Sequence, residues 1–189
     1  MPLAETASTF NECVVINAAI AASESREEKL ALVESQLQKI TQVICDIYSR
    51  FRFEMEVFEN RKTRFMDSDT LSEMMLAAQK QSYGDGLDHS CLHPYAWINK
   101  GHYYGPVYYN YPYAFGALFS RGLYARYEAE GPAFADTYKK LLYTTTVASA
   151  EDTAMVAGLD LTDKEFWRSA LKTVADEIDL FCELAQENQ

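Results

Sequence analysis

Residues 95–127 read YAWINKGHYYGPVYYNYPYAFGALFSRGLYARY. It holds nine of the thirteen tyrosines of the protein. Gly101, Pro106 and Pro112 prevent its first half from forming one uninterrupted helix. From Tyr113 onward, apolar residues recur at the spacing of a helix. The pattern therefore predicts a tyrosine-rich loop that leads into a buried helix.

The density of tyrosines in this stretch has two interpretations. Buried tyrosine hydroxyls need hydrogen-bond partners, so a dense group of them is typical of a polar cavity or an interface. The same residues could instead form an aromatic core beneath a long loop. Composition alone leaves both interpretations open.

The segments on either side of the tyrosine stretch predict an all-α fold. The eight glycines and five prolines gather mostly between residues 84 and 132, which leaves long uninterrupted segments on both sides. We expect about seven helices in a single domain spanning residues 1–189. One helix is expected to run unbroken from about residue 25 to Arg61. Its charged face is interpreted as solvated and comprises Glu34, Lys39, Asp46, Arg50 and Glu54.

The totals exclude several classes of function. A net charge of −11 argues against binding to nucleic acid or to an anionic membrane surface. No apolar run approaches the roughly 20 residues needed to span a bilayer. Cys13, Cys45, Cys91 and Cys182 form no CxxC pair, so we interpret them as separate reduced thiols in a cytoplasmic protein.

Two other segments carry candidate functional residues. In AETASTFNE, residues 4–12, the polar side chains Glu5, Ser8, Thr9 and Glu12 share one face of an otherwise apolar helix. The competing interpretation is a helix start at which the helix dipole favours carboxylates.

The second segment is the loop around His89 and His93. These two histidines lie four residues apart, but Gly86 and Pro94 bracket them so closely that a metal-binding helix face is disfavoured. We therefore expect ordinary loop histidines and not a zinc pair.

Several motifs occur together in one order along the chain. They are AETASTFNE, YGDGLD, HPYAWINKGHYY, YYNYPYAFG, ASAEDT and a final helix that contains Phe166 and Trp167. Together they resemble the C-terminal catalytic portion of oligoendopeptidase F, within the thimet-oligopeptidase-like family of zinc peptidases. The resemblance covers essentially the whole chain. It implies the C-terminal part of a zincin-like, all-helical catalytic domain with a deep channel for an oligopeptide substrate.

The resemblance also implies roles for individual residues. These peptidases bind one zinc ion through the two histidines of an HExxH helix and a glutamate from a following helix, and Glu5 matches that glutamate. The glutamate of HExxH acts as base towards a zinc-bound water. His102, Tyr109 and Tyr113 match the donors that stabilise the negative charge of the tetrahedral intermediate. Which of the two tyrosines faces the substrate stays open.

The sequence departs from the family pattern in one respect, because it contains no HExxH. Its histidines are His89, His93 and His102, and none fits that motif. We therefore expect this chain to be a fragment, with the remaining zinc ligands on a missing upstream half of the catalytic domain. By itself the chain should be inert, and it should either self-associate or need that upstream half. The alternative is a non-catalytic helical module that binds peptides or dimerises. A third interpretation is an unrelated helical bundle whose tyrosines form its core.

Overall fold

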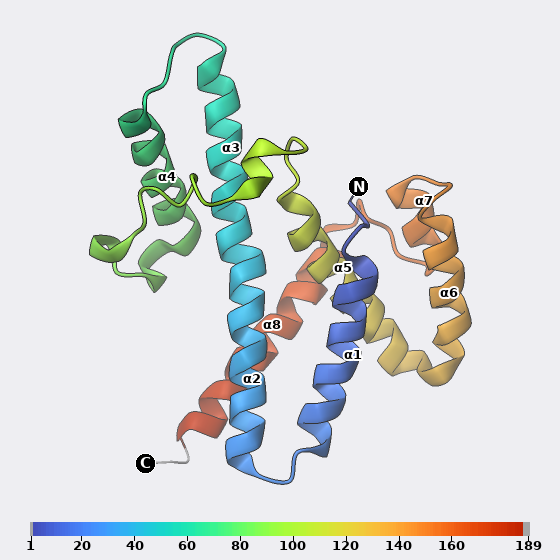
Figure 1. Ribbon diagram of the computed structural model, residues 1–189. Coiled ribbons are helices and arrows are strands. Elements are labelled where there is room, and N and C mark those ends of the chain that lie inside the picture. Colours follow the sequence, from blue (N-terminus) through green and yellow to red (C-terminus); the bar gives the residue numbers. More distant parts are fainter. Residues whose placement is uncertain (1, 187–189) are drawn as a thin grey trace. The chain divides into compact units, whose positions relative to one another are not determined.

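The computed structural model describes residues 2–186, and every regular element in that range is helical (Figure 1). The prediction of an all-α fold is confirmed. The α-helices are α1 (Thr6–Ala22), α2 (Arg26–Thr41), α3 (Ile47–Arg61), α4 (Ser68–Tyr83), α5 (Tyr111–Glu130), α6 (Phe134–Thr144), α7 (Ala150–Met155) and α8 (Lys164–Gln186). None of these helices has the length and apolarity that crossing a lipid bilayer requires.

The chain divides into two compact units, which we describe separately. The first unit comprises residues 1–40 and 115–189, and the second comprises residues 41–114. The first unit therefore holds α1, most of α2 and α5, and all of α6 to α8. The second unit holds α3, α4 and the first part of the tyrosine stretch. A single domain spanning 1–189 stays a prediction.

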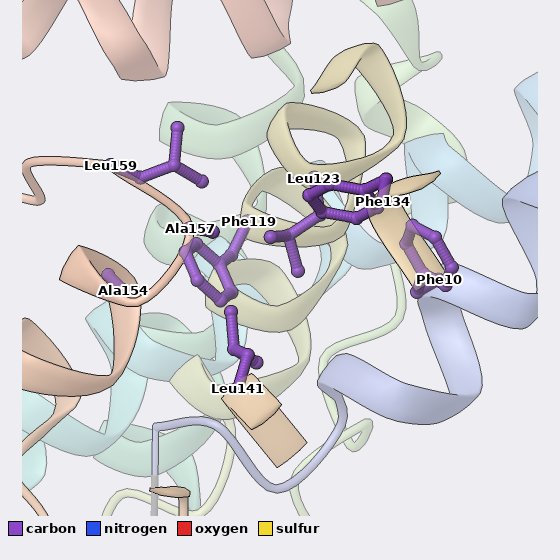
Figure 2. Close-up of a cluster of buried hydrophobic side chains, with 8 residues drawn as sticks. All are labelled: Phe10, Phe119, Leu123, Phe134, Leu141, Ala154, Ala157 and Leu159. Carbon is purple, nitrogen blue, oxygen red and sulfur yellow. The ribbon is translucent and has the colours of Figure 1, made fainter. Parts of the chain in front are cut away.

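The core of the first unit is built around α5. Figure 2 shows apolar side chains from α1, α5, α6 and the α7 region converging on one cluster. Phe119 and Leu123 of α5 and Leu141 of α6 are fully buried there. Burying side chains of this size contributes about 1.5–3 kcal/mol each relative to leaving them exposed. The helix predicted from the second half of the tyrosine stretch is therefore the centre of this unit.

The second unit is a helical hairpin of α3 and α4 that carries the tyrosine loop (Figure 1). Asp67 caps α4, because its carboxylate accepts a hydrogen bond from the backbone N–H of Thr70 at 2.9 Å. Phe53 and Met75 form the core between the two helices, and Tyr103 packs against them. The loop therefore rests on the hairpin through its own aromatic side chains.

The expected helical run from about residue 25 to Arg61 is confirmed, because residues 26–61 are helical throughout. The run is not regular, because a π-helical segment, Gln42–Asp46, separates α2 from α3. The assignment of its solvated face was wrong at two residues. A π segment inserts an extra residue into the helical register, so a face assigned by 3.6-residue spacing no longer holds beyond it. Arg50 and Glu54, which were assigned to the solvated face, are 6% and 5% exposed.

Candidate functional site

Three of the residues that the resemblance singles out gather in the second unit. His102 lies in a 3-10 turn, Gly101–Tyr104, while Tyr109 precedes α5 and Tyr113 lies in its first turns. The His102 Nε2 atom and the Tyr113 hydroxyl are hydrogen bonded at 3.0 Å. The rings of His102 and Tyr109 are nearly parallel, with centroids 6.4 Å apart.

Tyr113 completes the group by standing edge-on to both other rings. Its centroid lies 5.5 Å from that of His102 and 5.9 Å from that of Tyr109, with interplanar angles of 87° and 84°. We call His102, Tyr109 and Tyr113 the aromatic triad. All three are partly exposed, so the triad is open to solvent on at least one side.

The aromatic triad offers hydrogen-bond donors of two kinds. A phenol donates through its O–H, and an imidazole donates through whichever ring nitrogen carries the proton. The bond between His102 and Tyr113 orients both side chains. Groups fixed in this way can stabilise a developing negative charge without reorganising during a reaction.

Burial affects another tyrosine close to the triad in sequence. Tyr103 packs edge-on against Phe53 of α3, with ring centroids 5.2 Å apart. Burial raises the pKa of the Tyr103 hydroxyl, so this tyrosine is neutral at any physiological pH. Tyr103 follows His102 directly in the 3-10 turn and packs on α3, so it anchors this turn to the hairpin.

Glu5 belongs to the first unit and begins α1 as its N-cap residue. It is partly buried. Its backbone carbonyl accepts hydrogen bonds from the Ser8 hydroxyl at 3.0 Å and the Thr9 hydroxyl at 2.7 Å. Three of the four polar residues that sequence spacing placed on one face, Glu5, Ser8 and Thr9, therefore share a local network through the backbone carbonyl of Glu5.

A second set of contacts ties the start of α1 to α5. The Thr9 hydroxyl reaches the carbonyl of Gly116 at 3.1 Å and the hydroxyl of Ser120 at 2.6 Å. The Ser120 hydroxyl also donates to the carbonyl of Thr6 at 2.9 Å. Thr6 and Ser120 are fully buried, so these bonds form inside the core, where they are electrostatically stronger than in water. The first turn of α1 is thus held against α5.

The described residues do not form a complete metal site. Between residues 2 and 186, no three histidine, cysteine, aspartate or glutamate side chains gather closely enough to hold a metal ion. His89 is exposed and contacts the carbonyl of Gly84 at 2.9 Å, while His93 accepts a bond from the Tyr95 N–H at 3.1 Å. Catalytic zinc takes three protein ligands, so the residues present do not fit a zinc site by themselves.

Sequence reasoning missed two residues that shape the triad. Glu54 of α3 and Asn110, just before α5, are both buried and hydrogen bonded to each other at 3.0 Å. Glu54 was assigned to a solvated face because its spacing matched the charged residues of that face. A carboxylate in the middle of an aromatic stripe, between Phe51 and Phe58, was the available signal.

The chain is similar to known proteins in sequence and in fold. The sequence model described as "Peptidase family M3" matches residues 1–173. No curated protein matches the chain in sequence. The crystal structure of oligoendopeptidase-F from Enterococcus faecium is similar in fold, with a TM-score of 0.82 and 20% sequence identity. The match covers 98% of this chain and 36% of that chain, so this chain spans about a third of the length of that protein.

Proposed function

The chain belongs to peptidase family M3, and from this premise we propose that it supplies part of the active site of a zinc endopeptidase that hydrolyses short peptides. In this proposal Glu5 is one zinc ligand, and His102 with Tyr113 or Tyr109 provides the donors for the oxyanion. The observation that carries it is the aromatic triad, in which His102 and Tyr113 are hydrogen bonded at 3.0 Å.

The proposed role of Glu5 rests on how firmly its backbone is held. A metal ligand acts best when surrounding groups fix its orientation. The Thr9 hydroxyl holds the Glu5 carbonyl, and α5 packs directly against it at Gly116. Because the chain contains no HExxH, the two histidine ligands and the general base must come from outside residues 1–189.

The proposed role of the triad follows from the charge that develops during peptide hydrolysis. The carbonyl oxygen of the scissile bond becomes negative in the tetrahedral intermediate, and fixed donors stabilise it. An imidazole N–H and a phenolic O–H are donors of this kind. The partly exposed triad leaves room for a substrate to reach them.

A second candidate function is a non-catalytic module that binds peptides or dimerises. It is favoured by the finding that residues 2–186 gather no complete set of metal ligands. The two candidates differ in whether hydrolysis and bound zinc accompany the native protein.

We also propose that the protein works in the cytoplasm, since its four thiols are unpaired among the described residues.

The proposed function is tested on the protein purified from its native source. Its mass is measured, its zinc content is determined after desalting, and its hydrolysis of a quenched fluorescent peptide is followed. We expect bound zinc and hydrolysis wherever an HExxH segment accompanies the chain, and neither in the 189-residue chain alone. Glu5→Gln should reduce the zinc content, whereas Glu12→Gln should not, because Glu12 is exposed on the same helix.

Two results would contradict this assignment. Stoichiometric zinc in the 189-residue chain alone would move the ligand set to its own histidines. A native protein of the mass of the 189-residue chain that binds peptides without cleaving them would favour the non-catalytic module.

A further inference from the structure

One buried carboxylate holds the backbone that carries the aromatic triad. Glu54 lies on α3 and is 5% exposed. Its Oε1 atom accepts a hydrogen bond from the backbone N–H of Tyr108 at 2.9 Å, and its Oε2 atom accepts one from Asn110 Nδ2 at 3.0 Å. We call Glu54, Tyr108 and Asn110 the Glu54 clamp. Both carboxylate oxygens are thus used to bind residues that flank Tyr109.

The clamp coincides with an unusual backbone conformation. Tyr108 has a φ of 57°, and it is the one non-glycine residue with positive φ in the described chain. A residue with a Cβ adopts this left-handed conformation at a cost in free energy, and it does so where surrounding contacts over-determine it. A hydrogen bond from its N–H to a buried carboxylate is a contact of this kind, because charged acceptors form the stronger bonds.

The ring of Tyr108 is held on the same face of α3. Its centroid lies 5.5 Å from that of Phe51 and 5.4 Å from that of Phe58. Phe51, Glu54 and Phe58 are spaced by three and four residues, so they share one face of the helix. This face of α3 therefore contacts both the backbone N–H and the ring of Tyr108.

Fixing Tyr108 and Asn110 determines where Tyr109 and Tyr113 lie. Tyr109 is bonded covalently between the two clamped residues, and its own N–H donates to the Pro106 carbonyl at 3.3 Å. The carbonyl of Asn110 accepts from the N–H of Tyr113 at 3.3 Å, which starts α5. The positions of both triad tyrosines thus depend on the two bonds to Glu54.

We propose that Glu54 is a positioning residue that presents Tyr109 and Tyr113 to His102. The catalytic part of this inference rests on the proposed function, while the backbone part stands on the hydrogen bonds alone. A carboxylate that only satisfied buried donors would affect the stability of the fold and leave the kinetics of folded molecules unchanged. A positioning carboxylate affects the turnover of molecules that remain folded.

The backbone part is tested by hydrogen exchange on the full chain, with Glu54→Gln compared with Glu56→Gln. Glutamine keeps the shape of the side chain but turns one acceptor oxygen into a donor, which then faces the donors of the clamp. Glu56 is exposed on the same helix, so it is the matched control. In E54Q the Tyr108 amide should exchange about tenfold faster or more, as expected for the loss of a hydrogen bond to a charged group. The Met75 amide in the core should not change.

The catalytic part is tested in the complete peptidase that contains an HExxH segment. E54Q should lower kcat by about tenfold to a hundredfold, since a small misplacement of catalytic groups has effects of that size. KM should change little, because the triad is proposed to act in the transition state. E56Q should have normal values of both.

The outcomes separate this inference from the proposed function. Unchanged exchange of Tyr108 in folded E54Q overturns the clamp. Faster exchange with normal kcat, in an enzyme that His102→Ala still inactivates, overturns the positioning role alone. Normal kcat in His102→Ala overturns the proposed function, and the exchange result then still decides the clamp. If E54Q fails to fold, Asn110→Ser removes one of the two bonds and takes its place in both experiments.

Discussion

A Cβ atom added to Gly116 would lie 2.9 Å from the Cβ atom of Glu5 and 3.2 Å from its carbonyl carbon. Real Cβ atoms essentially never approach other heavy atoms more closely than 3.0 Å. The start of α1 therefore packs on α5 at a point where only glycine leaves enough room. This close approach is the structural reason that Glu5 has a fixed place in the first unit.

Gly116→Ala should lower the stability of the protein. Overpacking of a core site costs about 1–3 kcal/mol, which exceeds the gain of at most about 1 kcal/mol from the better helix propensity of alanine. Urea unfolding followed by circular dichroism measures the difference. Gly86→Ala is the control, because nothing lies within 4 Å of its added Cβ. A variant G116A that is more stable than the wild type would refute the tight contact.

The core around α5 predicts a large effect for one phenylalanine. Phe119→Ala removes a fully buried ring from the first unit and should destabilise it by about 3–5 kcal/mol. Phe65→Ala removes a ring that is 91% exposed and should change stability by less than about 0.5 kcal/mol. The midpoints of thermal or urea unfolding of the two variants give the comparison. Similar midpoints would mean that Phe119 is not in the core.

The ion pair between Arg121 of α5 and Glu177 of α8 is bidentate, with bonds of 2.6 and 3.0 Å. The Arg121 side chain is 8% exposed, so removing its partner leaves a buried charge unpaired. Glu177→Ala should therefore destabilise the protein by about 3–5 kcal/mol. Glu165→Ala breaks an exposed pair with Arg168 and should cost at most about 1 kcal/mol. Equal losses in the two variants would argue against a buried pair.

The helical class and the candidate residues could be predicted from the sequence, for identifiable reasons. Glycines and prolines lie mostly between residues 84 and 132, so helical periodicity is largely uninterrupted elsewhere and predicts an all-α fold. The motifs that contain His102 and Tyr113 identify them as candidate site residues from the sequence alone. The geometry that joins them, the bond from Nε2 to the hydroxyl, depends on how the loop folds back and has no signal in spacing.

The parts that sequence reasoning missed depend on contacts between distant segments. Glu54 binds Tyr108 and Asn110, which lie 54 and 56 residues away, and no local pattern encodes such a pairing. The π segment Gln42–Asp46 has helical neighbours on both sides, so its apolar stripe looked continuous. Local periodicity thus found the helices, while the buried polar network required the structure.

The pH dependence of stability at alkaline pH should come from buried tyrosines. Burial raises the pKa of Tyr83, Tyr124 and Tyr138 from an ordinary value of 10.0 to about 12 each. Below pH 10 these hydroxyls are protonated in the folded and the unfolded chain, so their contribution to the free energy of unfolding is fully present. Between pH 10 and about 12 the unfolded chain releases protons that the folded chain keeps, so stability falls as pH rises through this window.

Titration of the tyrosinate absorbance checks this prediction. The folded protein should show a group of tyrosines that ionise late, and the same group should ionise near pH 10 in denaturant. Tyr83→Phe should remove one late step. A folded protein in which every tyrosine ionises at the ordinary pKa would contradict the burial of these hydroxyls.

The final prediction concerns the aromatic triad in the complete peptidase, with its HExxH segment present. If His102 and Tyr113 donate to the oxyanion, each acts mainly in the transition state, so removing either lowers kcat far more than it raises KM. Loss of one such donor costs about 2.7–4 kcal/mol, which is roughly a hundredfold to a thousandfold in rate. His102→Ala and Tyr113→Phe should therefore both show this pattern, with zinc still bound.

Tyrosine-to-phenylalanine changes separate catalysis from packing, because phenylalanine keeps the ring and loses only the hydroxyl. A Tyr113 that only packs predicts normal turnover in Y113F and a stability loss of about 1 kcal/mol from one missing hydrogen bond. Comparing the turnover of Tyr109→Phe with that of Tyr113→Phe shows which of the two hydroxyls faces the substrate. The two rings are nearly perpendicular, with centroids 5.9 Å apart. Steady-state kinetics on a quenched peptide and zinc analysis supply the readouts. Near-normal turnover in His102→Ala with zinc retained would remove the triad from the mechanism, because loss of an oxyanion donor should slow turnover at least about a hundredfold.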